Sequence, residues 1–180
     1  MLPTIISGES NFTISSKEIQ PTGEVVSDVS KGYVTSAISL TQLEWNKEYN
    51  TNYNELDFNV STPVYNETIL KDFLAPIRQW CYRSHFLKLP PGGYFPPHRD
   101  KSWESIRLIL PLFNCNAPLT RFILEDKTLQ WELGRMYFVN TLKEHTLFNA
   151  SADQDSIWLV LNYIVNEESI NWIYKNLAIT

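Results

Sequence analysis

The stretch YFPPHRDKSWESIRLILPL, from Tyr94 to Leu112, joins a short extended segment to an apolar run typical of a strand. His98 and Asp100 stand two residues apart where the first segment ends, so their side chains can converge on one point. The second run carries Arg107 among apolar residues. An imidazole and a carboxylate placed in this way can begin a metal site, provided that the rest of the chain supplies a third ligand.

Extended runs separated by turn residues continue on both sides of this stretch. Gly, Pro, Asn and Asp punctuate the runs, which is typical of an all-β sandwich or barrel. Their number predicts a mainly β protein with a double-stranded β-helix core, the jelly roll of cupin-like proteins. We expect strands in HFLKL (85–89), YFPPH (94–98), SIRLILPLF (105–113), TRFILE (120–125), TLQWE (128–132), MYFVN (136–140), HTLFN (145–149) and SIWLVLNYIV (156–165).

The chain of 180 residues is long enough for one domain with a sizeable core. We expect N-terminal helices and extra strands in 1–84, the jelly roll in 85–165 and a C-terminal helix in 166–180. NETILKDFLAPIRQWCYR (66–83) has apolar residues at helical spacing, although its proline should kink or shorten the helix. LTQLEWNKEYN (40–50) predicts another short helix. Asn166 is the expected N-cap of the C-terminal helix.

The composition limits the class of protein. A hydrophobic content of 43% predicts a globular chain. A net charge of −5 offers no basic surface, so we expect no nucleic-acid partner. We expect no membrane span or secretion signal either, because no apolar run reaches about 18 residues and the N-terminus lacks a basic start, so the expected location is the cytoplasm. Cys81 and Cys115 are expected to be free core thiols.

His145 opens a later extended run and is the candidate third ligand. A jelly roll can return the chain beside its first strands, so His145 can meet His98 and Asp100. Two imidazoles and one carboxylate leave three coordination positions open, as in the facial triad of non-haem Fe(II) oxygenases. Zn(II) can bind the same ligands, and histidines that merely pack are a further alternative. His85 has no acid close by in the sequence and predicts a packed or surface histidine.

The segment 89–149 resembles the aspartyl/asparaginyl β-hydroxylase family of the 2-oxoglutarate/Fe(II)-dependent oxygenases. The family's intervals around its iron ligands are reproduced by Pro91, Gly92, Pro97, His98, Arg107, Gly134, His145 and Asn149. The resemblance implies a single oxygenase-like domain that uses Fe(II) and 2-oxoglutarate. It also implies hydroxylation of a C–H bond in a small molecule, a peptide or a protein, with His98, Asp100 and His145 as metal ligands and catalytic centre.

This sequence departs from the family pattern at three positions. Asp100 stands where the family usually has glycine, which completes the triad of the wider superfamily. Ile109 replaces a histidine. Asp155 replaces the arginine that grips the distal carboxylate of 2-oxoglutarate in the family. Such a carboxylate needs a cation in a desolvated pocket, so another residue must supply one.

Arg107 is the first candidate for this contact, although it can instead pair with an internal acid such as Glu104 or Asp100. Arg121 and then Lys88 are the reserve candidates, and Asn162 can face the cavity or be satisfied by backbone. Residues that could wall a substrate pocket, or be plain core, are Tyr94, Trp103 and Trp158. Two alternative functions are a cupin-type metalloenzyme without 2-oxoglutarate and a non-enzymatic β-roll used for binding or structure.

Overall fold

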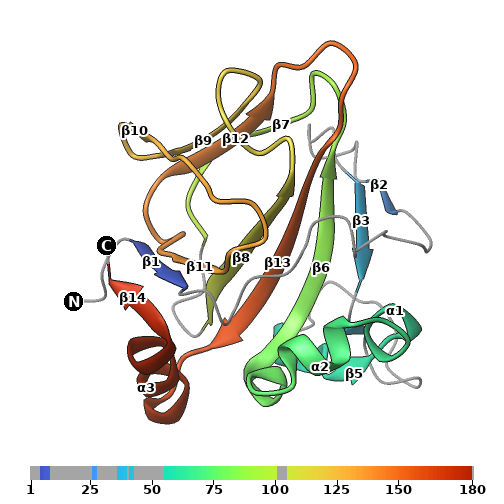
Figure 1. The fold of residues 1–180 in the computed structure, drawn as a ribbon, viewed down its shortest axis with the longest axis vertical. Helices are drawn as coiled ribbons and strands as arrows, with labels where there is room; N and C mark the ends of the chain where they lie inside the picture. Colours follow the sequence, from blue (N-terminus) through green and yellow to red (C-terminus); the bar gives the residue numbers. More distant parts are fainter. Residues whose placement is uncertain are drawn as a thin grey trace.

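Two β-sheets face each other in the computed structural model of the protein, and short helices lie at one end (Figure 1). The structure describes residues 5–8, 26–27, 36–39, 41–42, 55–100 and 105–179. No helix in this described part of the chain is both long enough and apolar enough to cross a membrane.

The larger sheet has the strand order β14-β1-β11-β8-β13-β6-β3-β2. Its strands are β1 (Ile5–Gly8), β2 (Val26–Ser27), β3 (Ser36–Ser39), β6 (Cys81–Leu89), β8 (Ser105–Phe113), β11 (Tyr137–Val139), β13 (Ser156–Ile164) and β14 (Leu177–Ile179). The smaller sheet has the order β10-β9-β12-β7, and a separate pair joins β4 to β5. These strands are β4 (Thr41–Gln42), β5 (Val60–Ser61), β7 (Tyr94–His98), β9 (Thr120–Leu124), β10 (Lys127–Thr128) and β12 (His145–Asn149).

From β6 to β13 the chain alternates between the two sheets, except that β9 and β10 form a hairpin within the smaller one. Strands β6, β8, β11 and β13 therefore face β7, β9, β10 and β12. This is the double-stranded β-helix that the spacing of the extended runs predicts, and the fold-class prediction is confirmed. All the strand pairs in the two sheets are antiparallel within the described residues. The two long strands β8 and β13 pair along most of their length and form the middle of the larger sheet.

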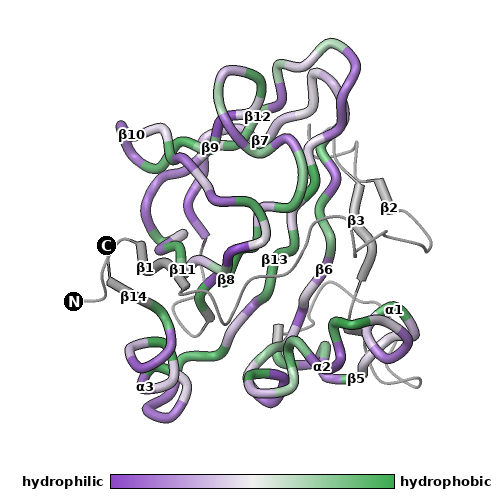
Figure 2. The backbone as a smooth tube through the Cα atoms, in the orientation of Figure 1, coloured by the Kyte–Doolittle hydropathy of each residue, from purple (hydrophilic) through white to green (hydrophobic). Residues whose placement is uncertain are grey.

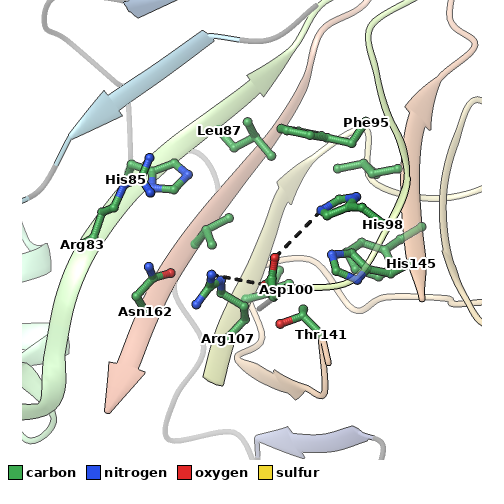
Figure 3. Close-up of a pocket in the computed structure, with 14 residues that line it drawn as sticks. Arg83, His85, Leu87, Phe95, His98, Asp100, Arg107, Thr141, His145 and Asn162 are labelled. Carbon is green, nitrogen blue, oxygen red and sulfur yellow. Dashed lines mark ion pairs between the residues drawn. The ribbon is translucent and has the colours of Figure 1, made fainter. Parts of the chain in front are cut away.

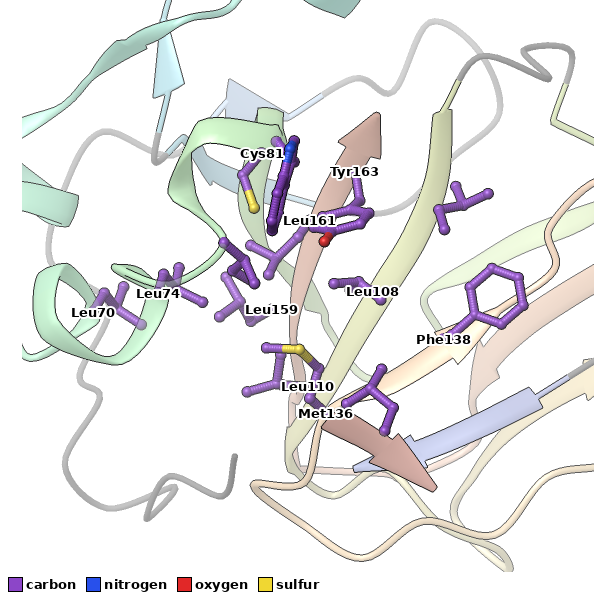
Figure 4. Close-up of a cluster of buried hydrophobic side chains, with 14 of the residues drawn as sticks. Leu70, Leu74, Cys81, Leu108, Leu110, Met136, Phe138, Leu159, Leu161 and Tyr163 are labelled. Carbon is purple, nitrogen blue, oxygen red and sulfur yellow. The ribbon is translucent and has the colours of Figure 1, made fainter. Parts of the chain in front are cut away.

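The larger sheet is buried on both faces, which explains why its central strands read as almost continuous apolar runs. Alternate residues point to opposite faces of a strand. On β13, Leu159 and Leu161 pack in the outer core, which is drawn in Figure 4. Trp158 and Val160 point instead into the inner core between the sheets. Figure 2 accordingly shows much of β6 and β13 in the hydrophobic colour.

Helical turns cover the outer face of the larger sheet. They are η3 (Glu55–Asp57), α1 (Pro63–Asn66), α2 (Leu70–Leu74), η4 (Arg78–Trp80) and α3 (Glu167–Asn176). Leu70, Leu74 and Ile77 are buried in the outer core, so the apolar spacing identified the correct buried face. The helix predicted over 66–83 is shortened at its proline, as expected, because α2 ends two residues before Pro76. The chain then forms η4 and a strand that begins at Cys81, so the end of the predicted range is not α-helical.

Strand β6 starts four residues before the predicted start at 85 and contains a bulge. The pairing with β13 shifts between Leu161, opposite Ser84, and Tyr163, opposite Cys81, so β6 holds one extra residue there. The bulge reverses the alternation, which is why Cys81 packs in the outer core together with Phe86. Cys81 and Cys115 are both free and buried, as expected, and burial raises the pKa of each thiol to about 12.

Two other boundaries differ from the sequence predictions by more than one residue. The expected strand 128–132 stops at Thr128, because the Asn116 side chain occupies the backbone groups of Trp131. Asn116 Oδ1 accepts from the Trp131 N–H at 2.7 Å, and Asn116 Nδ2 donates to the Trp131 C=O at 2.9 Å. The C-terminal helix does begin after its predicted N-cap, Asn166, which forms a capping box with Ser169. It ends at residue 176, and the chain continues as β14, which pairs with β1.

In the N-terminal region, the predicted helix over 40–50 falls partly on β4, which is a strand. The rest of that prediction lies outside the described residues. Strand β3, one of the extra strands in 1–84, pairs with β6 and so extends the larger sheet. Strand β5 is another, and α1 follows it.

Asn149, at the end of β12, forms hydrogen bonds that hold neighbouring chain segments together at one end of the roll. Its side-chain N–H groups point to the carbonyl oxygens of Leu89, Pro90 and Gln154 at 3.1, 3.2 and 2.6 Å. Its Oδ1 accepts from the Ser151 backbone N–H at 3.0 Å. Its backbone exchanges hydrogen bonds with the adjacent turn, where Gly92 has a positive φ of 72° that suits glycine.

We expect Asn149→Ala to lower the free energy of unfolding by about 3 kcal/mol, because the substitution leaves several buried carbonyl groups without hydrogen-bond donors. Urea unfolding followed by circular dichroism measures this change. Asn66→Ala is the matched control, since its exposed amide makes one long hydrogen bond of 3.4 Å, and it should cost less than about 0.5 kcal/mol. Equal losses in the two variants would contradict the assigned role of Asn149.

Candidate metal centre

The smaller sheet brings two histidines together at one end of the roll. β7 ends at His98 and β12 begins at His145, and the antiparallel register sets these two residues directly opposite each other. Their ring centroids lie 4.2 Å apart. Asp100 follows β7, and its backbone N–H donates to the Thr141 carbonyl at 2.9 Å, which fixes the chain at this point.

Each histidine ring is held by a hydrogen bond to a backbone carbonyl two residues before it. His98 Nδ1 lies 2.7 Å from the Pro96 oxygen, and His145 Nδ1 lies 3.0 Å from the Lys143 oxygen. A carbonyl oxygen only accepts, so Nδ1 of each ring must carry the proton. The lone pair of each neutral ring is therefore on Nε2, as a metal ligand requires.

The Asp100 carboxylate completes the group. Its Oδ1 lies 3.9 Å from His98 Nε2, and its Oδ2 lies 3.2 Å from Arg107 Nη2 (Figure 3). One ligand atom from each of Asp100, His98 and His145 lies within 4.8 Å of the other two. Ligands at right angles around an ion about 2.1 Å away lie roughly 3 Å apart, so small side-chain rotations suffice to close the group around a metal.

His145 is the buried member of the group. Its ring stacks on Phe122, with 5.8 Å between centroids and 6° between planes. Burial lowers the pKa of His145, and the neighbouring His98 and Arg107 act in the same direction against the opposing effects of Asp100 and the Lys143 carbonyl. His145 therefore presents a neutral imidazole at pH 7, the form that coordinates metals.

A cavity of about 240 Å³ extends from these three residues between the two sheets. This volume is ample for several water molecules and so for a small organic molecule. Apolar side chains and polar groups share its lining, which consists of Arg83, His85, Leu87, Phe95, His98, Asp100, Arg107, Ile109, Phe122, Thr141, His145, Leu147, Val160 and Asn162.

The structure brings together some of the predicted site residues and separates others. Arg107 and Asn162, opposite each other on β8 and β13, both line the cavity. Arg107 also forms the ion pair with Asp100 that the alternative interpretation predicts. Arg121 does not line the cavity: it is exposed on β9, because its neighbour Phe122 takes the inward position. The Lys88 ammonium lies 2.8 Å from Asp155 and is likewise outside the cavity.

The proposed pocket aromatics do not line the cavity within the described residues. Tyr94 is 43% exposed, and Trp158 is 1% exposed in the inner core, where its Nε1–H donates to Ser156 at 2.7 Å. Trp103 lies outside the described residues. Two cavity residues were missed as site residues: Arg83, and His85, which the sequence analysis took for a packed or surface histidine. The period-two pattern of β6 is the signal that could have placed His85 beside Leu87.

A double-stranded β-helix with two histidines and an aspartate at the mouth of a cavity has the architecture of the non-haem iron oxygenases. The chain belongs to the aspartyl/asparaginyl β-hydroxylase family, whose sequence profile matches residues 13–164. This match confirms the family resemblance and the class of enzyme, a hydroxylase. A comparison with curated proteins finds no match.

Several solved structures resemble this chain at low sequence identity. An oxidoreductase of the 2OG-Fe(II) oxygenase family from Burkholderia pseudomallei is 10% identical with a TM-score of 0.51, over 72% of this chain and 68% of that one. A prolyl-4-hydroxylase from Pseudomonas putida is 13% identical with a TM-score of 0.47, over 79% and 78%. A cupin 2 conserved barrel domain protein from Salinispora arenicola is 9% identical with a TM-score of 0.42, over 88% and 96%.

His85 predicts a pH dependence of stability. Burial, together with Arg83 and Arg107, lowers its pKa from 6.5 to about 3. Below pH 6.5, His85 therefore binds a proton in the unfolded chain but stays neutral in the folded protein. The free energy of unfolding consequently falls as the pH falls from 6.5 towards 3. We expect His85 to account for about 1–2 kcal/mol of the stability lost between pH 7.5 and pH 5.0.

Urea unfolding of wild type and His85→Gln at both pH values measures this contribution. The variant lacks the titrating group, so its stability should fall less than that of the wild type over this interval. Identical pH slopes for the two proteins would show that His85 is protonated in the folded state as readily as in the unfolded chain.

Proposed function

We propose that the protein is a single-domain 2-oxoglutarate- and Fe(II)-dependent dioxygenase, and that it hydroxylates a C–H bond of an amino-acid residue, a peptide or a small amino-acid-like molecule. The observation that carries this proposal is the set of three ligand atoms at the cavity mouth, with both imidazoles held in the tautomer that leaves Nε2 for a metal. Family membership supplies the class of reaction.

The residues fit Fe(II). Nitrogen and carboxylate oxygen ligands suit a divalent ion of intermediate hardness, and three protein ligands leave positions for a co-substrate and dioxygen. The described thiols take no part, because Cys81 and Cys115 do not line the cavity. Zn(II) can occupy the same three ligands, but a hydroxylase needs a metal that changes its oxidation state, and Zn(II) does not.

Each residue of the site has a distinct task in this proposal. His98, Asp100 and His145 hold the ion, and Arg107 orients the Asp100 carboxylate through its second oxygen. Arg107 and Asn162 face the cavity and contact the co-substrate. When bound, the iron uses dioxygen to convert 2-oxoglutarate into succinate and carbon dioxide and to place one oxygen atom on a substrate C–H bond.

The apolar part of the lining keeps bulk water away from the reacting groups. Leu87, Ile109 and Val160 form this part on the larger sheet, and Phe95 and Leu147 form it on the smaller sheet. Excluding water strengthens every charge interaction inside the cavity and limits wasteful side reactions. Tyr94 and Trp103 lie before and after the ligand pair His98 and Asp100 in the sequence, and we propose them as substrate contacts.

We expect Mn(II), a stable stand-in for Fe(II), to raise the melting temperature by several degrees, because a ligand at 100 times its dissociation constant adds about 2.7 kcal/mol to stability. 2-Oxoglutarate should raise it further only when Mn(II) is present. His98→Ala and Asp100→Ala should remove most of the Mn(II) effect. Differential scanning fluorimetry of each protein without ligand, with Mn(II), with 2-oxoglutarate and with both measures these melting temperatures.

Asp126→Ala is the matched control, since it removes an exposed aspartate from a turn away from the cavity. Its melting temperature should respond to Mn(II) as the wild type does. Metal binding with no response to 2-oxoglutarate would favour a cupin-type metalloenzyme. No response to Mn(II) or Fe(II) at all would overturn the proposal. Formation of succinate that depends on 2-oxoglutarate and Fe(II) then tests the reaction itself.

A further inference from the structure

A short turn holds two of the three candidate metal ligands. We call residues 140–144, which join β11 to β12, the ligand turn. The Thr141 carbonyl accepts the Asp100 backbone N–H at 2.9 Å, and the Lys143 carbonyl lies 3.0 Å from His145 Nδ1. Figure 3 shows Thr141 beside Asp100. The ligand turn therefore sets the chain position of one ligand and the ring orientation of another.

Glu125, from a different part of the chain, contacts the ligand turn at two points. Its carboxylate Oε2 lies 2.7 Å from Lys143 Nζ, and its backbone N–H donates to the Glu144 carbonyl at 2.7 Å. The first contact holds the residue whose carbonyl accepts from His145. The second contact continues the pairing of β9 with β12 beyond the pair of Leu124 with His145. Glu125 thus holds the two residues before His145 without lining the cavity itself.

The backbone of Glu125 has a conformation that a glutamate disfavours. The pairing of Leu124 with Lys127 joins β9 to β10 through a loop of two residues, Glu125 and Asp126. Glu125 has a φ of 55°, in the left-handed region where Cβ lies too close to the following carbonyl oxygen. Glycine and asparagine are the usual residues at such a position of a hairpin loop. A glutamate therefore makes this hairpin less stable than either of them would.

The ion pair of Glu125 adds little stability to offset this strain. The Glu125 side chain is 50% exposed and the Lys143 side chain is 35% exposed, so water and dissolved salt screen the two charges. Strained residues of this kind cluster at functional sites. The carbonyl that this ion pair helps to place fixes the tautomer of His145, and the tautomer decides whether Nε2 has a lone pair for a metal.

Resting on the proposed function, we propose that Glu125 is a positioning residue for the metal centre. By its contacts with Lys143 and the adjacent backbone, it holds the ligand turn where the Lys143 carbonyl accepts the Nδ1–H of His145. Nε2 of His145 then keeps its lone pair for the metal, and the same turn holds the backbone of Asp100. A strained hairpin of the smaller sheet thereby fixes two ligands that other parts of the chain supply.

The first test separates positioning from stability with Glu125→Asn, which suits a positive φ but is too short for the ion pair. Isothermal titration of Mn(II) into the full chain gives the metal dissociation constant. Loss of a group that contacts a ligand directly costs about 10- to 100-fold in affinity, and Glu125 acts one step further away, so we expect about 3- to 10-fold weaker binding. The melting temperature without metal should equal or exceed that of wild type, because the strain is relieved.

The second test needs no metal. Long-range proton–nitrogen NMR spectra of the full chain identify the tautomer of each imidazole, and three histidines keep the spectra simple. Wild-type His145 should carry its proton on Nδ1. In Glu125→Asn the Lys143 carbonyl is less firmly placed, so a population of His145 with the proton on Nε2 should appear.

Further variants identify the ion pair as the cause. Lys143→Gln keeps its own backbone carbonyl but loses the pair, so it should weaken Mn(II) binding as Glu125→Asn does. The double variant should be little worse than either single one, because both remove the same interaction. Glu132→Gln is the matched control, since it breaks an exposed ion pair with Arg135 at the same distance of 2.7 Å outside the cavity. It should bind Mn(II) as wild type does.

The possible failures are distinguishable. If Glu125→Asn binds Mn(II) as wild type does, or if Glu132→Gln weakens binding equally, the positioning assignment is wrong and the proposed function stands. If Glu125→Asn lowers the melting temperature together with the affinity and leaves the His145 tautomer unchanged, Glu125 has a structural role only. If wild type binds neither Mn(II) nor Fe(II), the proposed function fails, and a role of Glu125 at a metal centre fails with it.

Discussion

The antiparallel pairing of β7 with β12 is the constraint on which the site depends. Its register sets His145 opposite His98, although many residues and several strands separate them in the chain. Backbone carbonyls two residues before each histidine then fix both rings by their Nδ1 atoms. With the rings fixed, Asp100 needs only the ion pair with Arg107 to hold its carboxylate beside them. The sheet thus fixes the ligand geometry before any metal binds, which lowers the cost of binding.

Much of the roll could be predicted because period-two alternation and turn residues act locally. β7, β8 and β12 begin and end where their runs do. The prediction failed where a tertiary contact decided the local structure. Residues 81–83 fit the helical spacing before them, yet they form the start of β6, because the end of β13 requires a pairing partner there. Likewise, Asn116 occupies the backbone groups of Trp131 and so ends the strand expected after Thr128.

The candidate site shows the same difference between local patterns, which the sequence reveals, and tertiary contacts, which it does not. The interval between His98 and Asp100 is a local pattern, and the sequence placed both correctly in relation to one strand end. Alternation alone cannot say which face of β9 points inward, and the packing of Phe122 against His145 shows that Arg121 lies on the outer face. Arg83 and His85 were missed for the same reason. They alternate with Leu87 along β6, and only the packing of Leu87 in the inner core shows which face of this strand points into the cavity.

The position of charge on β6 links fold and function in this protein. Lys88 and His85 are three residues apart and therefore point to opposite faces of the strand, so the strand serves two separate purposes. An exposed ion pair such as Lys88–Asp155 contributes about 0–1 kcal/mol, so stability alone gives little reason to keep it. Both charges lie outside the cavity and compensate each other there, so the ion pair is separate from the residues of β6 that face the site. An acid at position 155 is therefore compatible with the proposed co-substrate, because its charge is paired outside the cavity.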